Sequence, residues 1–335
     1  DLILNNGLNV YGKTNYQRAI YDDGPFTDNM LFYNTDKLGF ISQLQIGTVL
    51  RDISVYKLYY KAPNLSALSD TIYLYFFGCH LKAGAADYQQ RNTEIQQAKF
   101  YLNSISDVVE NVFVGGDMNV YSGFESAVLT LKNTGDVPLF DPINVDGNWS
   151  GDPAYSAYHT QSTRNGSGYA NGAGGGMDDR FDMIFVSADV LNNDNGVQYV
   201  SNSYEALGQD GFRFNQEINN PTNNSVPDSV ANALLRVSDH LPVVMTVALD
   251  ETASVEQASK KMLRFHYSPS EQKLVLLNDG DYYRLKVYDT KGIKVSAYEG
   301  TDNKVSLSHL STGVYLIKIK ATAGFYTRKI FIGPQ

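Results

Sequence analysis

The stretch Val112-Phe113-Val114-Gly115-Gly116-Asp117-Met118-Asn119 indicates how this chain folds and where its polar chemistry gathers. Its β-branched and aromatic residues predict a short buried strand that ends at the two glycines. Asp117 and Asn119 follow two residues apart, so in an extended chain their side chains point to the same side. A carboxylate that accepts a proton and an amide that donates hydrogen bonds suit an anionic group. The alternative is an ordinary Asx turn after a buried strand.

Similar apolar runs occur on both sides of this stretch. They predict strands over residues 30–33, 72–78, 183–186 and 243–247. Residues 85–105 predict a helix, because Ile95, Ala98, Leu102 and Ile105 form one apolar stripe. Strands mixed with helices indicate an α/β or α+β domain.

Three further polar clusters lie at predicted strand ends. His80 closes the run 72–78, Asp182 precedes the run 183–186, and Asp239-His240 precede the run 243–247. At a strand entry Asp239 and His240 can divide two tasks, one reaching a metal and the other a phosphate. Such a histidine works best with a carboxylate that fixes its tautomer, for which Asp182 is the first candidate and Asp179 the second.

Two arginines are candidates for contacting an anion. Arg91 lies four residues before Ile95 on the predicted helix and could reach the end of the sheet, and Arg180 belongs to the cluster that contains Asp182. Each polar cluster also has a structural explanation: a polar turn, a half-buried histidine, or an arginine that packs its stem on apolar surface.

Charge and composition bound the function. The chain has 335 residues, 43% of them hydrophobic and 19% charged, which allows a sizeable core and argues against disorder. Residues 1–250 carry 14 basic and 28 acidic side chains, which argues against tight, salt-sensitive binding of nucleic acid through basic patches alone. Carboxylates that bind a cation fit this balance. No apolar run is long enough to cross a membrane, and the one cysteine, Cys79, excludes an intramolecular disulfide.

A composition change divides the chain. Residues 1–250 read as one domain, the polar segment 251–261 as a linker, and residues 262–335 as a small second domain. The second domain shows short strands separated by turn signals and no helical pattern, which predicts a small β-sandwich.

The order of the polar clusters resembles the endonuclease/exonuclease/phosphatase superfamily, the DNase I-like fold, over essentially residues 1–250. The resemblance implies a four-layered α/β sandwich with two packed β-sheets and hydrolysis of phosphoesters with Mg²⁺, or with Mn²⁺ or Ca²⁺. It implies these catalytic roles: His80 contacts the phosphate, Asp117 activates water, Asn119 binds a phosphoryl oxygen, and Asp182 pairs with His240, which contacts the scissile phosphate or transfers a proton. Asp239 then helps to hold the metal, while Arg91 and Arg180 bind substrate.

One departure from the family pattern concerns the metal. The family carries a metal-binding Glu near its amino terminus, whereas the first Glu here is Glu94, on the predicted helix. We therefore expect that the chain begins inside the domain, lacks its first strands, binds metal weakly as given, and exposes apolar sheet surface.

The second domain resembles the C-terminal sorting domain of type IX secretion substrates in Bacteroidota. The resemblance rests on residues 287–292, 307–316 and 327–330 (VYDTKG, LSHLSTGVYL and TRKI). It implies an Ig-like β-sandwich that outer-membrane machinery recognises, and hence a secreted or surface-exposed protein that is not stably inserted in the membrane.

The leading hypothesis from sequence is a secreted nuclease that cleaves extracellular DNA or RNA. A lipid phosphodiesterase of the same fold, similar to sphingomyelinase, is the alternative substrate class, for which Phe212 and Phe214 are the only hints. A third hypothesis is a catalytically incomplete surface protein. Composition and motif order do not decide among them.

Overall fold

The computed structural model describes residues 1–63, 71–105, 109–166, 168, 172–249, 265–269, 271–276, 283–290, 293–321 and 324–333. They divide into two compact units, one from the described residues up to 249 and one from those beyond 265, with Ile105 grouped in the second. The predicted linker 251–261 lies outside the described residues.

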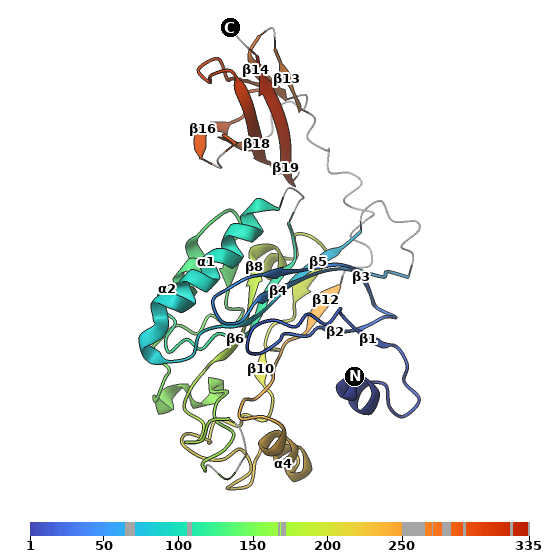
Figure 1. Cartoon of the computed structure of the whole chain (residues 1–335), viewed down its shortest axis with the longest axis vertical. Helices are drawn as coiled ribbons and strands as arrows, with labels where there is room; N and C mark the ends of the chain where they lie inside the picture. The colour runs from blue at the N-terminus through green and yellow to red at the C-terminus, as the bar shows by residue number, and fades with distance from the viewer. Residues whose placement is uncertain are drawn as a thin grey trace. The chain divides into compact units, whose positions relative to one another are not determined.

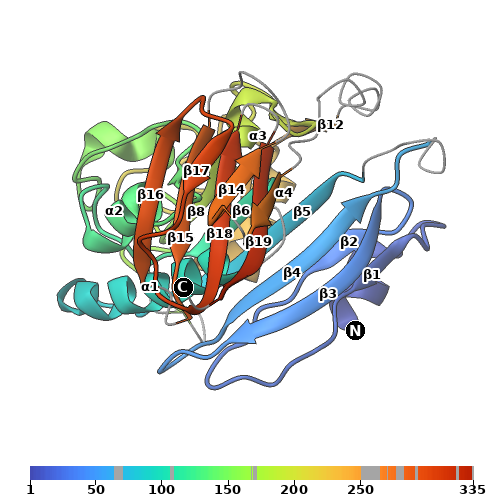
Figure 2. The same cartoon turned by 90° about the horizontal axis from the view of Figure 1, so that it is seen from above.

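A six-stranded sheet forms the centre of the first unit (Figure 1). Its strand order is β3-β4-β5-β6-β8-β7. The bounds are β3 Leu38–Ile46, β4 Ile53–Tyr60, β5 Tyr73–His80, β6 Val112–Asp117, β7 Leu139–Phe140 and β8 Asp182–Ser187. Only β5 and β6 pair in parallel, and the chain between them forms helix α1, Tyr88–Ser104, as a parallel connection requires. Figure 2 shows β3, β4 and β5 side by side.

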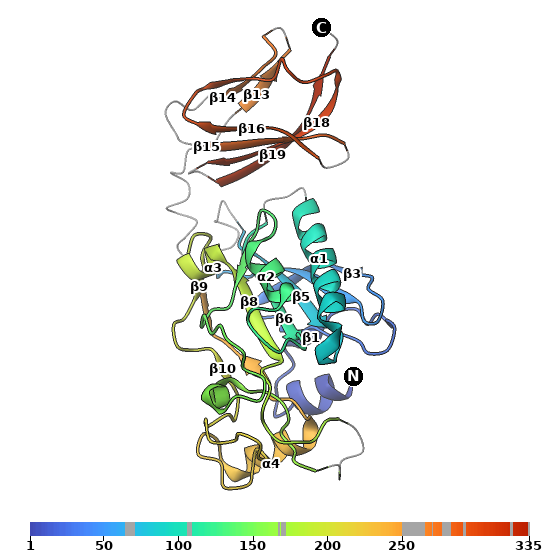
Figure 3. The ribbon, with the colours of Figure 1, turned by 90° about the vertical axis from the view of Figure 1, so that its left-hand side faces the viewer.

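Helices cover one face of this sheet. A 3₁₀ turn, Ala85–Asp87, precedes α1, which packs beside α2, Ser126–Asn133 (Figures 1 and 3). The predicted apolar stripe is confirmed for Ile95, Ala98 and Leu102, which are all buried. Ile105 lies beyond the end of the helix. The remaining helical segments are η1 Leu4–Leu8, η4 Pro153–Tyr158, α3 Ala188–Asn192 and α4 Asp228–Val237.

Short antiparallel pairs complete the first unit. They are β1 Tyr16–Arg18 with β2 Phe32–Asn34, β9 Val197–Tyr199 with β12 Val247–Leu249, and β10 Glu205–Ala206 with β11 Val243–Val244. The first pair packs Ala19 and Tyr33 against Tyr56 and Leu58 of β4. The second shares a core with Phe113 of β6. The α/β class is thus confirmed, with small sheets packed against a large one. The run 243–247, expected as one strand, is divided between β11 and β12, which have different partners.

A groove of about 630 Å³ lies beside β1. Its lining includes Leu4, Ala19, Ile20 and Tyr21, and β1 bonds only to β2 among the described strands. Asp1, Asn5, Gln17 and Arg18 line the same groove, so this edge presents a mixed surface on which Ile20 and Tyr21 are exposed.

The second unit is a β-sandwich, as predicted. A three-stranded sheet contains β13 Phe265–Ser268, β14 Lys273–Leu276 and β17 Lys304–Ser306. A four-stranded sheet contains β15 Tyr283–Tyr288, β16 Lys294–Gly300, β18 Gly313–Ala321 and β19 Gly324–Ile332 (Figure 3). The alternating residues Leu285, Val287, Ile317 and Ile319 point into the core between them. Within the described residues, no helix has the length and apolar character needed to span a membrane.

Candidate active site

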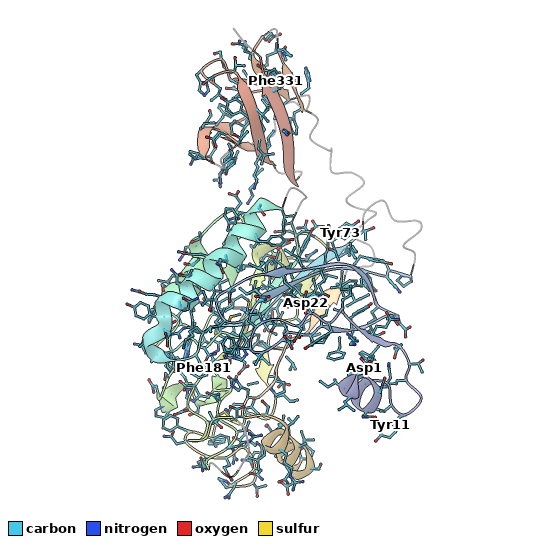
Figure 4. The ribbon with its side chains drawn as sticks, in the orientation of Figure 1. Asp1, Tyr11, Asp22, Tyr73, Phe181 and Phe331 are labelled. Carbon is cyan, nitrogen blue, oxygen red and sulfur yellow. The ribbon has the colours of Figure 1, made fainter. Side chains whose placement is uncertain are left out.

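The strand register aligns three polar side chains at one edge of the six-stranded sheet. His80 at the end of β5 is the register partner of Asp117 on β6, and Asp117 is the partner of Asp182 at the start of β8. Gly116 permits this alignment, because a Cβ atom there would lie 2.0 Å from the carbonyl oxygen of Cys79. Phe181, labelled in Figure 4, is buried immediately before Asp182 and helps to fix the strand end.

His240 reaches this row from the segment that follows α4. The backbone N–H of Leu241 donates to the carbonyl of Thr160 at 2.8 Å, and the Ser238 hydroxyl accepts from the backbone N–H of His240 at 3.0 Å. The His240 ring then stands with Nδ1 2.7 Å from Asp182 Oδ2 and Nε2 3.9 Å from Asp117 Oδ2. The predicted pairing of Asp182 with His240 is present, while Asp179, the second candidate, has no contact with the ring among the described interactions.

The two histidines have opposite electrostatic surroundings. Burial alone would lower the pKa of His240, but the hydrogen bond and charge of Asp182, followed by the charges of Asp117 and Asp239, raise it to about 9. Burial, followed by the positive charge of Arg51, lowers the pKa of His80 to about 4. Near neutral pH the site therefore holds one imidazolium and one neutral imidazole.

Asp117 lies between these rings. Burial raises the pKa of its carboxyl to about 6, although the charge of His240 and the backbone N–H of Asn119 act in the opposite direction. Its Oδ2 atom is 3.3 Å from Nε2 of His80. A carboxylate with a pKa near 6 can accept a proton at neutral pH, which general base catalysis requires.

Asn119 is brought to Asp117 by a turn and not by an extended chain. Its φ angle is 49°, and its backbone N–H donates to Asp117 Oδ1 at 2.9 Å. The geometric reason given for this pair from sequence is therefore wrong, because the chain turns directly after β6. The side-chain amide of Asn119 donates to the carbonyl of Leu81 at 3.0 Å, and a second amide hydrogen remains for an oxygen ligand.

Asp239 lies near the same ring nitrogen of His240 as Asp117 does. Its Oδ2 is 3.9 Å from His240 Nε2 and accepts a hydrogen bond of 2.7 Å from the backbone N–H of Ala173. Burial opposes ionisation of this carboxyl, but the Ala173 N–H and the charge of His240 lower its pKa below the ordinary value. The backbone N–H of Ala173 thus favours the charged form of Asp239.

The substrate-binding roles expected for Arg91 and Arg180 are corrected by their burial. Arg91 is completely buried and forms a two-pronged ion pair with Glu125. Arg180 is 1% exposed and pairs in the same way with Asp141. A guanidinium that is buried and already bonded cannot contact a substrate, so both arginines position the chain beneath the site.

Two residues at the site were missed from sequence. Arg51, which lies two residues before β4, donates from Nε to Thr27 Oγ1 at 3.0 Å and from Nη1 to the Leu81 carbonyl at 3.3 Å. Within the described part of the chain it forms no ion pair, and its charge acts on both His80 and Asp117. Gln161 contacts His240 and Asp239. Neither residue lies in a recognisable motif, so no sequence signal pointed to them.

The oxygen donors of the site suit a hard divalent cation only in part. The carboxylates of Asp117 and Asp239 each have Oδ2 3.9 Å from Nε2 of His240. Mg²⁺ commonly binds through one or two carboxylates while it retains several waters. Across the described ranges, no group of three or more His, Cys, Asp and Glu residues is arranged as a metal site. The donor chemistry thus fits a water-rich Mg²⁺ site and not a closed protein cage.

Comparison with known proteins places the second unit in a class. Residues 268–333 match the family described as the secretion system C-terminal sorting domain. The predicted resemblance of the tail is therefore confirmed, and the chain carries a secretion sorting domain. A search of curated proteins gave no match.

Several solved structures are similar to this chain. They include the catalytic domain of human nocturnin with bound sulfate, at 11% identity and TM-score 0.40, with 70% of this chain and 73% of that one covered. A humanised TDP2 of D. rerio has 14% identity and TM-score 0.39, with 70% and 76% covered. An endonuclease/exonuclease/phosphatase from Beutenbergia cavernae has 13% identity and TM-score 0.33, with 88% and 73% covered. The third bears the name of the family that the sequence resembles.

Proposed function

We propose that the first unit is a divalent-metal-dependent phosphodiesterase. The observation that carries this proposal is the convergence of His80, Asp117, Asp182 and His240, aligned by the strand register and by one histidine–carboxylate pair. The nearby cation of Arg51 supports it, because a phosphoryl group needs positive charge and hydrogen-bond donors around its oxygens.

Asp239 is the residue that would hold the metal, as expected from sequence, and Asp117 is left to act on water. When bound, a divalent cation supplies positive charge that polarises the phosphoryl oxygen. The remaining steps fall to side chains of this chain. Asp117, which is mostly ionised above pH 6, orients a water molecule and accepts its proton.

The imidazolium of His240 donates from Nε2 toward the phosphoryl group, while Asp182 holds Nδ1 and fixes the ring. The second amide hydrogen of Asn119 offers a further donor to the same oxygens. The neutral ring of His80 carries one N–H, which reaches these oxygens when it is not bonded to Asp117. Positioning and charge stabilisation are what phosphoryl transfer chiefly requires.

The test is hydrolysis of bis(p-nitrophenyl) phosphate and of plasmid DNA by the full chain and by a version extended upstream, each with Mg²⁺, Mn²⁺ or Ca²⁺. We expect cleavage that EDTA abolishes, and loss of at least about 100-fold in His240→Ala and Asp117→Ala. The matched control is Asp179→Ala, which removes a neighbouring carboxylate that has no contact with His240. Absence of hydrolysis in both versions with all three metals would refute the enzyme and support a non-catalytic surface protein.

Within this class, we propose that the substrate is extracellular DNA or RNA. The second candidate substrate is a lipid diester, because the side chain of Phe212 is 72% exposed and could contact a membrane. It lies on a loop fixed by Arg213, which bonds to both carboxylate oxygens of Asp210. Phe214 packs against His159 and presents no comparable surface. Sphingomyelin vesicles cleaved faster than plasmid DNA, with a loss in Phe212→Ala, would favour the lipid.

We propose that the sorting domain directs export through the type IX machinery to the surface of a Bacteroidota bacterium. The family match over residues 268–333 supports this route. The proposed domain boundaries, 1–250 and 262–335, predict that deletion of the second domain leaves hydrolysis intact and stops delivery to the cell surface. Export that persists after this deletion would contradict the assignment.

A further inference from the structure

Both ring nitrogens of His240 have a partner in this structure. Nδ1 is bonded to Asp182, and Nε2 lies 2.6 Å from the side-chain amide nitrogen of Gln161. The same amide nitrogen lies 3.3 Å from Asp239 Oδ2. Gln161 therefore covers the one nitrogen of His240 that Asp182 leaves free.

The backbone of Gln161 is held firmly. Its N–H donates to the carbonyl of Asp179 at 3.1 Å, and its carbonyl accepts from the N–H groups of Asp178 and Asp179 at 2.8 and 3.0 Å. It also forms an antiparallel bridge with His240. These bonds fix the point from which the side chain extends toward the imidazole.

The head group of Gln161 is held differently. Among the described residues, the hydrogen bonds of its side chain go only to His240 and Asp239. Within the part of the chain that the structure describes, no residue outside the site bonds to the amide, and Gln161 is half-buried. A rotation about the side-chain torsions of Gln161 would uncover Nε2 of His240 without a change in the backbone.

An amide is suited to this position because it carries both a donor and an acceptor, whose assignment in coordinates is interchangeable. A neutral ring can accept from the amide N–H, and an imidazolium can donate to the amide oxygen. The amide can thus bond to Nε2 in either protonation state, but only the orientation with its nitrogen toward Nε2 also donates to Asp239.

We propose that Gln161 is a positioning residue that occupies Nε2 of His240 in the free protein and is displaced when a phosphoryl oxygen binds there. This inference rests on the proposed function, because it identifies the phosphoryl group as the competitor. Gln161 holds the ring in place before binding and weakens the apparent affinity for the phosphoryl group, since its own hydrogen bond must first break.

The experiment is a titration of the full chain with inorganic phosphate, followed by NMR of glutamine side-chain amides labelled with ¹⁵N. The Gln161 signal is assigned by its absence in Gln161→Leu. We expect phosphate to shift this signal and to leave that of Gln209 unchanged, because the Gln209 amide donates to the His159 carbonyl at 2.9 Å and accepts from Gly211 at 3.0 Å. Phosphate should bind Gln161→Leu about threefold to tenfold more tightly, the range expected for one net hydrogen bond.

The outcomes separate the two proposals. If phosphate binds, as shown by shifts of the His80 and His240 ring signals, while the Gln161 signal stays unchanged, the inference is overturned and the proposed function stands. Equal or weaker phosphate binding by Gln161→Leu that folds normally also overturns it. If phosphate does not bind wild-type protein at all, the proposed function fails and the inference fails with it. The signal shift is measured on wild-type protein, so it decides the matter even where the variant does not fold.

Discussion

Replacement of Asp182 by Asn should make the stability of this protein depend less on pH. In the folded protein the pKa of His240 rises from 6.5 to about 9, against the effect of burial, because of Asp182 first and Asp117 and Asp239 next. A histidine whose folded pKa is raised contributes stability that is complete below pH 6.5 and is lost as the pH rises through 9. The difference between these pKa values corresponds to ~3 kcal/mol at about 1.36 kcal/mol per pH unit.

Only part of this free energy belongs to Asp182, since two other carboxylates contribute. A hydrogen bond to a charged group contributes about 1.5–3 kcal/mol. We therefore expect Asp182→Asn to lower the free energy of unfolding by ~1.5–3 kcal/mol at pH 6, and by much less at pH 9.5, where His240 is largely neutral in the wild type too.

Urea unfolding at pH 6, 7.5 and 9.5 measures this difference, and NMR titration of the His240 ring measures the pKa directly. The matched control is Asp179→Asn, which removes a neighbouring carboxyl whose pKa is raised by burial and which does not touch the ring. The reasoning is refuted if the loss in Asp182→Asn is the same at all three pH values, or if Asp179→Asn lowers the His240 pKa as much.

Three other outcomes follow from the same geometry. Burial is the largest effect that raises the pKa of Asp117 from 3.8 to about 6, so the ionised carboxylate lowers the stability of the folded protein above pH 6. Asp117→Asn should therefore raise the free energy of unfolding by about 1–3 kcal/mol at pH 7 and leave it unchanged at pH 3.5. Urea unfolding at the two pH values measures this difference. For the same reason, hydrolysis should rise with pH through about 6, and a rate that falls over this range would contradict a basic role for Asp117. Arg180→Ala should lower the free energy of unfolding by about 3–5 kcal/mol, because it leaves the buried Asp141 carboxylate without its ion-pair partner. Arg51→Ala should lower it by about 1 kcal/mol or less and should raise KM for the phosphodiester. Equal losses of stability in the two variants would contradict this prediction.

Local sequence patterns predicted the elements of the fold that depend on neighbours in the chain. Strand β6 and helix α1 were placed from apolar runs and from a stripe with helical spacing, because burial of one face imposes these periods. The sandwich strands of the second unit were predicted for the same reason. The division of residues 243–247 into β11 and β12 was not, because it depends on which distant strands pair with each half.

For the candidate site too, the sequence predicted the residues that are marked by local patterns but not their tertiary partners. His80, Asp117, Asp182, Asp239 and His240 stood out in the sequence, since strand ends with clustered polar residues are marked by composition alone. The ion-pair partner of each charged residue could not be predicted from the sequence, because ion pairing depends on distances in the folded protein and on burial. Arg91 and Arg180 looked like ligands for an anion until Glu125 and Asp141 were found to bond them.

The sequence by itself therefore determined the α/β class, the polar residues at the strand ends and the sorting domain, since each depends on local order along the chain. Only the tertiary structure decided that Asp182 and not Asp179 holds His240, that the charge of Arg51 acts on His80 and Asp117, and that Gln161 covers Nε2. The physical reason is that hydrogen bonds and charges act over a few ångströms in space, and residues 58 or 79 positions apart meet only once the sheet has formed.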